Sequence, residues 1–188
     1  MLNKKTLLAI VLLFMAALLV NPANCLAGKI PATGDIFPAE ELKMPEGEEH
    51  LKYLGLDPTK ETFKLRDIKA DFALVQIFSM YCPVCQRGAP EFNEVYRLIM
   101  ESEAADKIKV VGIAPGNSAF EVSVFRGQYN ILFPLIPDAD FEWHKIMGEV
   151  GTPYYLLVNL RDGMILEDNL GPFGTAQEFF KVIMQHVK

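Results

Sequence analysis

The sequence predicts an α/β domain in which helices flank a central mixed sheet that is largely buried. Apolar runs alternate with amphipathic segments along most of the chain, which is the pattern of βαβ units. The run Phe72–Phe78 is nearly continuous in apolar character, as expected of a strand covered on both faces. Later, Tyr154–Asn159 and Met164–Leu170 flank the turn Arg161-Asp162-Gly163, which predicts an antiparallel hairpin.

The first 27 residues have the composition of a secretory signal peptide. Two lysines precede an apolar run, Leu7–Val20, that is shorter than the ~20 residues needed to span a bilayer comfortably. Small residues follow it, which completes the signal pattern. We expect residues 1–27 to be removed by cleavage after Ala27, or as a second choice after Cys25, and the mature protein to be periplasmic or otherwise exported.

Cys25 also allows another interpretation, a lipoprotein anchor. The residues before it, Pro22-Ala23-Asn24, match poorly the small apolar residues that normally precede a lipidated cysteine. Cleavage that removes Cys25 is therefore preferred. It leaves two cysteines in an exported protein, an even number whose simplest use is one disulfide.

An N-terminal arm is expected ahead of the folded domain. Residues 28–62 are rich in Pro, Gly, Glu and Lys, which predicts irregular structure, and the acidic cluster at positions 46–49 is expected to be solvated. The segment Tyr53–Leu56 is expected to dock on the domain. Residues 63–188 then form the domain itself.

The first strand of the domain leads into a cysteine pair. Cys82 follows the strand by four residues, and Pro83 suits the first turn of a helix, where its missing N–H costs nothing. Side chains then recur at helical spacing: Cys85, Ala89, Phe92, Tyr96 and Ile99. The stretch Cys82-Pro83-Val84-Cys85 is therefore expected at a strand-to-helix junction.

The middle of the chain predicts a second strand and a second helix. Val110–Ala114 is a buried-strand candidate, and a helix should begin near Ser118, because Glu121 completes a capping box with it. Pro134–Pro137 is expected to be a short extended link. Three aromatic residues here are core candidates: Phe120, Phe125 and Phe133.

The last third of the chain predicts two more helices around the hairpin. Asp140–Met147 suits a short helix that Gly148 ends, and Thr175 with Glu178 forms a second capping box. Apolar residues follow that box at helical spacing: Phe179, Phe180, Ile183 and Val187. The expected order is β-α-β-α-short helix-β-β-α.

Charge and composition argue against several kinds of partner. The chain has 18 Lys and Arg residues against 24 Asp and Glu, and no basic block, stripe or tail, so we expect no nucleic-acid partner. No internal repeat or low-complexity tract interrupts it. We expect one domain that acts as a monomer.

Three roles compete for Cys82 and Cys85. A zinc site needs two more ligands, and no second C-x-x-C motif exists, so we expect no metal. The remaining ligand candidates are scattered histidines: His50, His144 and His186. A structural disulfide closing so short a loop would remove little unfolded-state entropy. A redox role is favoured.

The expected positions of the two thiols on the helix predict different roles for them. The reactive species in disulfide exchange is the thiolate, and a helix N-terminus lowers a thiol pKa with its unpaired N–H groups and positive dipole. Cys82 occupies that position and is the predicted nucleophile. Cys85, one turn later on the side facing the core, is predicted to resolve the mixed disulfide. No cofactor beyond this redox-active pair is expected.

These motifs resemble the thioredoxin-like superfamily. Phe72–Pro90 is similar to a thioredoxin-fold active site, and Gly151-Thr152-Pro153 with the strand after it is similar to the cis-proline segment. Pro134–Asp138 and the helix after it resemble the TlpA-like branch of exported thiol-disulfide oxidoreductases, which is related to the alkyl hydroperoxide reductase/thiol-specific antioxidant group. The resemblance covers about residues 63–188.

The resemblance implies a site and partners. Pro153 would be cis and pack beside the disulfide, leaving the backbone before it free to pair with a bound peptide. The implied substrate-binding residues are Tyr81, Pro83, Thr152 and Pro153. The substrates would be thiols or disulfides of other exported proteins, with apocytochrome c as the family's typical target and a membrane protein as electron donor.

This chain departs from the resembled pattern at three positions. Gln76 stands where thioredoxin carries a buried acid and TlpA-like proteins often carry Asn, and Gly88 stands where many TlpA-like proteins carry Glu. Tyr81 replaces the usual Trp. The fold is little affected, but the family's usual proton-transfer groups are missing.

Two other functions remain alternatives. A peroxiredoxin of the related group needs Pro-x-x-x-Ser/Thr-x-x-Cys; Ser79 fits this pattern, but Val75 stands where Pro is required. A non-catalytic binding module would keep the cysteine pair as a relic or regulator. The intact Cys-Pro-Val-Cys argues against that module, while Gln76 and Gly88 leave it open.

Overall fold

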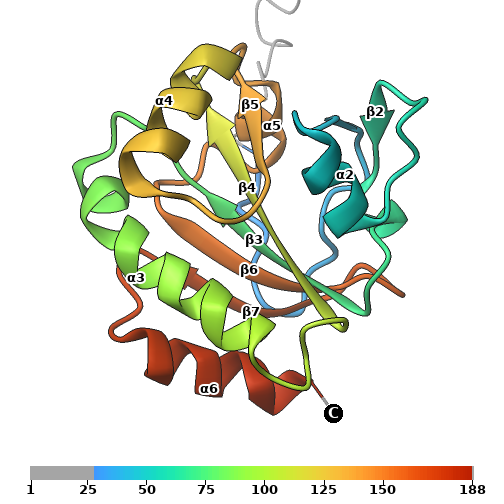
Figure 1. The fold of residues 1–188 in the computed structure, drawn as a ribbon, viewed down its shortest axis with the longest axis vertical. Helices are drawn as coiled ribbons and strands as arrows, with labels where there is room; N and C mark the ends of the chain where they lie inside the picture. Colours follow the sequence, from blue (N-terminus) through green and yellow to red (C-terminus); the bar gives the residue numbers. More distant parts are fainter. Residues whose placement is uncertain (1–27, 188) are drawn as a thin grey trace, which may run out of the picture.

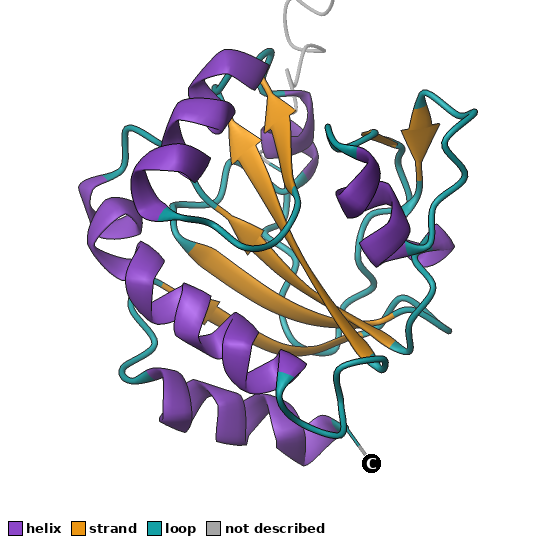
Figure 2. Cartoon of the chain, viewed as in Figure 1, coloured by secondary structure: helices purple, strands orange, loops and turns teal. Residues whose placement is uncertain are grey.

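The computed structural model describes residues 28–187. A five-stranded mixed sheet has helices on both faces (Figures 1 and 2), which confirms the predicted α/β class. The predicted signal peptide and Cys25 lie outside the described residues. Within residues 28–187, no helix is both long enough and apolar enough to cross a membrane.

The elements appear nearly in the predicted order. They are β1 (Leu42–Lys43), α2 (Glu48–Leu54), β2 (Thr62–Phe63), β3 (Phe72–Ile77), α3 (Pro83–Met100), β4 (Ile108–Pro115), α4 (Ala119–Tyr129), β5 (Leu135–Asp138), α5 (Glu142–Ile146), β6 (Tyr154–Asn159), β7 (Ile165–Leu170) and α6 (Ala176–His186), with a 3-10 turn at Leu65–Asp67.

Strand β3 lies at the centre of the sheet, whose order is β5-β4-β3-β6-β7. It pairs in parallel with β4 and antiparallel with β6. In the second pairing Ile77, at the end of β3, is opposite Tyr154, at the start of β6. This register brings the chain before β6, which contains Thr152 and Pro153, to the same edge of the sheet as Cys82.

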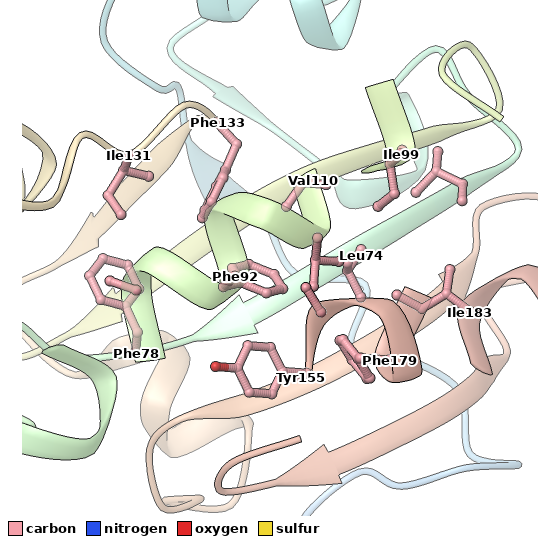
Figure 3. Close-up of a cluster of buried hydrophobic side chains, with 14 of the residues drawn as sticks. Leu74, Phe78, Phe92, Ile99, Val110, Ile131, Phe133, Tyr155, Phe179 and Ile183 are labelled. Carbon is pink, nitrogen blue, oxygen red and sulfur yellow. The ribbon is translucent and has the colours of Figure 1, made fainter. Parts of the chain in front are cut away.

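The two faces of the sheet carry two cores. Leu74 and Phe78 of the β3 segment pack under α3, α4 and α6, whereas Ala73, Val75 and Ile77 pack on the opposite side under α5 and the N-terminal arm. Figure 3 shows the first core, with aromatic side chains from the sheet and helices in contact. Because both faces are covered, the apolar run that predicted β3 has almost no polar interruption.

The N-terminal arm has more regular structure than its composition predicts. Strands β1 and β2 form a small antiparallel sheet, and α2 lies between them in sequence. Leu54 and Leu56 are buried, so the predicted docking of this segment is confirmed. The acidic side chains at positions 46, 48 and 49 are exposed, as expected.

The start of the arm runs along the outer edge of β7. The Gly34 N–H donates to the Ile165 carbonyl at 2.9 Å, and the Ile165 N–H donates to the Asp35 carbonyl at 2.9 Å. The Thr33 hydroxyl and N–H both donate to the Asp168 carboxylate, at 2.7 and 2.8 Å. The arm therefore occupies backbone groups of an edge strand.

The segment Pro134–Pro137 is extended, as predicted, but the prediction missed its pairing, because β5 forms there and pairs in parallel with β4. Pro137 is tolerated because β5 is an edge strand, where a missing N–H removes no ladder bond. The pairing covers β4 only from Gly112 onward. Before that point, the Val110 N–H donates instead to the Tyr53 hydroxyl of the arm at 2.9 Å.

Helix starts follow their sequence signals closely. The predicted capping boxes Ser118–Glu121 and Thr175–Glu178 are both present. The predicted short helix is α5, and Gly148 follows it with a positive φ of 69°.

One core prediction of this region is wrong. Phe125 and Phe133 are buried, but Phe120 is 75% exposed. It sits in the first turn of α4, where the helix extends beyond the core that Phe125 reaches one turn later.

Candidate active site

Cys82 lies where the chain leaves β3 and enters α3. It is the N-cap residue, with extended backbone (φ −82°, ψ 112°), and Pro83 is the first residue of the helix, as the sequence predicts. The Cys82 sulfur accepts a hydrogen bond from the Cys85 N–H at 3.3 Å. One of the unpaired N–H groups of the helix start is therefore directed at this sulfur.

Two side chains hold the loop before Cys82. The buried Asn117, from the β4–α4 loop, accepts the Met80 N–H on its Oδ1 at 2.8 Å. Gln86, from α3, donates to the Met80 carbonyl at 2.6 Å. The Cys82 N–H donates to the Ser79 carbonyl at 3.0 Å, which closes the turn. No sequence motif pointed to Asn117, which is 37 residues away from Met80.

Replacing Asn117 tests whether this support reaches the thiol. We expect Asn117→Ala to lower the free energy of unfolding by about 1–3 kcal/mol and to move the pKa of Cys82 upward, because the loop no longer aligns it with the helix start. Urea unfolding and alkylation rates across pH measure both. Asn93→Ala is the matched control, since Asn93 is also buried but bonds the Tyr129 and Asn130 carbonyls. Equal reactivity of Cys82 in the two variants would show that Asn117 does not position this thiol.

The surroundings of Cys82 favour its thiolate. Although partial burial favours the neutral thiol, hydrogen bonds from the Cys85 thiol and the Thr152 side chain hold the pKa of Cys82 below its ordinary value. The backbone N–H groups of Cys85 and Val84, in the first turn of α3, act in the same direction. The side chain is partly exposed, so this sulfur is open to a substrate.

Cys85 has the opposite character. Only 1% of it is exposed, and it packs in the core beneath α3. Burial raises the pKa of the Cys85 thiol to about 12, and the facing Cys82 sulfur adds to this rise. The two thiols are therefore arranged as one reactive and one protected group.

The polar groups next to Cys85 are neutral. Gln76 of β3 is 3% exposed and pairs across the sheet with Tyr155 of β6, which is 2% exposed. Gly88 of α3 adds no side chain; a Cβ there would lie 4.0 Å from the Tyr155 hydroxyl. The sequence pointed to Gln76 and Gly88 but missed Tyr155. The alternation of β6 places Tyr155 on the same face as Pro153, and that signal could have found it.

The segment before β6 contacts the reactive thiol. The Thr152–Pro153 peptide bond is cis, as the resemblance implies. The Cys82 thiol donates a hydrogen bond to the Thr152 carbonyl at 3.3 Å. Of the predicted substrate-binding residues, Pro83, Thr152 and Pro153 thus lie around Cys82.

Tyr81, the fourth predicted substrate-binding residue, lies at the rim and is 64% exposed. Its hydroxyl donates to the Glu121 carboxylate at the start of α4. This bond raises the pKa of Tyr81 and lowers that of Glu121. Tyr81 therefore presents a fixed aromatic surface beside the reactive thiol.

A groove of about 290 Å³ lies on the other side of the cysteine pair. It is formed by the first turns of α3, by Pro153 and Tyr155, and by the loop between β7 and α6. Its lining residues are Val84, Arg87, Gly88, Glu91, Pro153, Tyr155, Pro172, Phe173 and Gly174. The groove is mostly apolar, and its charged residues are Arg87 and Glu91.

Known proteins with similar sequences are thiol-disulfide oxidoreductases. The ResA thiol-disulfide oxidoreductase of Bacillus thuringiensis is 25% identical over 138 residues, which cover 72% of this chain and 75% of the relative. The ResA protein of Bacillus anthracis matches to the same extent.

Solved structures share the fold. StoA from Bacillus subtilis superposes with a TM-score of 0.54 at 21% identity, covering 80% of this chain and 98% of StoA. A thiol:disulfide interchange protein of the thioredoxin family from Chlorobium tepidum gives a TM-score of 0.58 at 15% identity, covering 86% of this chain and all of that one.

A family model described as the AhpC/TSA family matches residues 34–169, which run from before β1 into β7 and include Cys82 and Cys85. The chain belongs to the AhpC/TSA family and has its thioredoxin-like fold.

Proposed function

We propose that this protein uses the Cys82–Cys85 pair to reduce or exchange disulfides in other exported proteins. It is an enzyme of the thiol-disulfide oxidoreductase class, the class in which its ResA relatives are named. The observation that carries the proposal is the division between the two thiols: Cys82 is accessible with a lowered pKa, and Cys85 is buried with a raised one.

The reaction has two exchange steps. The Cys82 thiolate attacks one sulfur of the substrate disulfide, forming a mixed disulfide and releasing the other substrate sulfur as a thiolate that takes up a proton. Cys85 then loses its proton and attacks the Cys82 sulfur. The Cys82–Cys85 disulfide forms, the bond to the substrate breaks, and the second substrate sulfur leaves. The enzyme pair is oxidised by two electrons and the substrate disulfide is reduced.

The surroundings of Cys82 support binding of a polypeptide substrate. The exposed Tyr81 on one side and the apolar groove on the other give contact surfaces beside the reactive sulfur. Thr152 contacts Cys82 and Pro153 lines the groove, and we propose that the Thr152 backbone pairs with the substrate chain. The pair needs no metal or further cofactor for this chemistry.

The cellular setting is part of the same proposal. The signal-like residues 1–27 support export, and in an oxidising compartment a reducing enzyme needs electrons from a membrane donor. By resemblance, the cysteine pair of apocytochrome c is the proposed substrate, and the enzyme acts as a monomer.

A direct comparison of substrates tests the function. The reduced full-length protein is mixed with a disulfide-bonded peptide or with hydrogen peroxide, and loss of its thiols is followed in each. We expect rapid oxidation by the peptide, and equilibration with glutathione buffers then gives the reduction potential. Faster consumption of peroxide than of the peptide disulfide would instead establish the peroxiredoxin alternative, and inertness toward both would leave the binding module.

A further inference from the structure

The resolving step needs something that stabilises charge on Cys85. This thiol is buried, and its proton must leave as the sulfur attacks Cys82. An ionised carboxylate beside it would serve, but the neighbouring positions 76 and 88 carry an amide and no side chain. Against the larger effect of burial, the Thr152 side chain and a backbone hydrogen bond at Ser79 already lower the pKa of Cys85. A further hydroxyl near this thiol is that of Tyr155, whose own pKa is raised by burial and by Cys85.

The position of Tyr155 is fixed by packing. Its ring contacts three other aromatic rings, with centroids at 4.8 Å for Phe92, 5.0 Å for Phe173 and 5.6 Å for Phe179. Figure 3 shows the hydroxyl oxygen directed away from Phe179. With the ring held on several sides, the hydroxyl has a defined location.

That location is next to the resolving thiol. A Cβ on Gly88 would lie 4.0 Å from the phenol oxygen. Cys85 and Gly88 are three residues apart on α3, so they are neighbours on one face of the helix. Tyr155 also lines the groove. The hydroxyl thus lies between the buried thiol and the open groove.

We propose that Tyr155 is a hydrogen-bond donor that stabilises the Cys85 thiolate while it attacks the mixed disulfide. This inference rests on the proposed exchange function. Tyr155 keeps its own proton throughout, and the Cys85 proton passes to water in the groove. Gln76 lies opposite Tyr155 across the sheet, and against the larger effect of burial its side chain lowers the pKa of the phenol.

The charge environment agrees with a donor rather than a base. Burial raises the pKa of Tyr155 well above its ordinary value, the nearby Cys85 raises it further, and the Gln76 amide offsets part of the rise. The other titratable groups near the pair are Cys82 on α3 and, along the groove, Arg87 and Glu91. Glu91 already accepts the Ala176 N–H at the start of α6.

Tyr155→Phe removes only the hydroxyl and keeps the ring contacts. We expect it to leave mixed-disulfide formation by Cys82 unchanged and to slow the resolving step by about ten- to a hundredfold near neutral pH. In a Cys82→Ala background, the Cys85 pKa, followed by the ¹³C shift of its Cβ, should rise by about one unit. A purely structural role would not move this pKa.

The controls separate the possible failures. Tyr154→Phe removes the neighbouring buried hydroxyl, which bonds Pro31 and Asp168 on the opposite face, and should change neither quantity. Wild-type resolution by Tyr155→Phe, or equally slow resolution by Tyr154→Phe, would overturn the inference. A wild-type protein that forms no mixed disulfide at all would instead overturn the proposed function.

Discussion

We expect Cys82→Ser to abolish disulfide exchange, while Cys85→Ser traps a mixed disulfide with the substrate. Cys82 is the accessible thiol at the helix start, so removing it removes the attacking sulfur. Cys85 is buried, so its loss spares the first attack but leaves nothing to resolve the product. Non-reducing gels and intact mass, recorded with a disulfide-bonded peptide, detect the trapped species.

The reactivity of each thiol also tests the assignment of roles. Alkylation of the reduced wild-type protein near neutral pH should label Cys82 far faster than Cys85, because only Cys82 combines exposure with a lowered pKa. Faster labelling of Cys85, or a mixed disulfide trapped by Cys82→Ser, would exchange the two roles.

Turnover should rise steeply with pH in the wild-type protein. With a Cys85 pKa of about 12, the thiolate fraction of the resolving sulfur grows about tenfold per pH unit across the neutral range. We expect the resolving rate, measured by stopped flow with a model disulfide, to follow that slope. Cys82, with its lowered pKa, should make the first step much less dependent on pH.

The stability of the protein limits how high a pH can be used for this measurement. The folded pKa of Cys85 lies above its ordinary value of 9.0, so burial of the neutral thiol stabilises the reduced protein fully below about pH 9. That stabilisation is lost as the pH rises toward 12. Rates should therefore be compared below about pH 9, and a flat profile there would show that the proton leaves Cys85 by a faster route.

A carboxylate introduced at position 88, in the groove, should accelerate the resolving step. Gly88→Glu has room, since its Cβ would meet only the Tyr155 hydroxyl at 4.0 Å. A base next to Cys85 should accelerate resolution near neutrality by roughly tenfold or more and flatten the pH profile. Gly127→Glu is the matched control: it adds the same charge to α4, where nothing lies within 4 Å of the new Cβ. Equal rates in both variants would refute a local effect.

Local chemistry explains what the sequence predicted well. The capping boxes of α4 and α6, the proline at the start of α3 and the turn between β6 and β7 all act within a few residues. These signals placed Cys82 at a helix start and Pro153 before the hairpin. The chemistry of the nucleophile could therefore be anticipated from short stretches alone.

Contacts between distant residues explain the rest. Strand β5 exists because β4 offers a free edge, which the short segment around Pro137 does not reveal. Tyr155 faces Cys85 only after β6 pairs with β3 in one register. Phe120 is apolar but lies beyond the reach of the core, and composition does not distinguish it from Phe125.

The attachment of the arm to β7 has a consequence for the order of folding. Thr33 and its partner Asp168 are 135 residues apart. The start of the arm is synthesised early, but its hydrogen bonds can form only after β7 has been synthesised. Such long-range closure slows folding. Until β7 is in place, the start of the arm has no partner strand and the second core lacks Ile165, and incomplete packing of this kind exposes apolar surface to chaperones and to other chains.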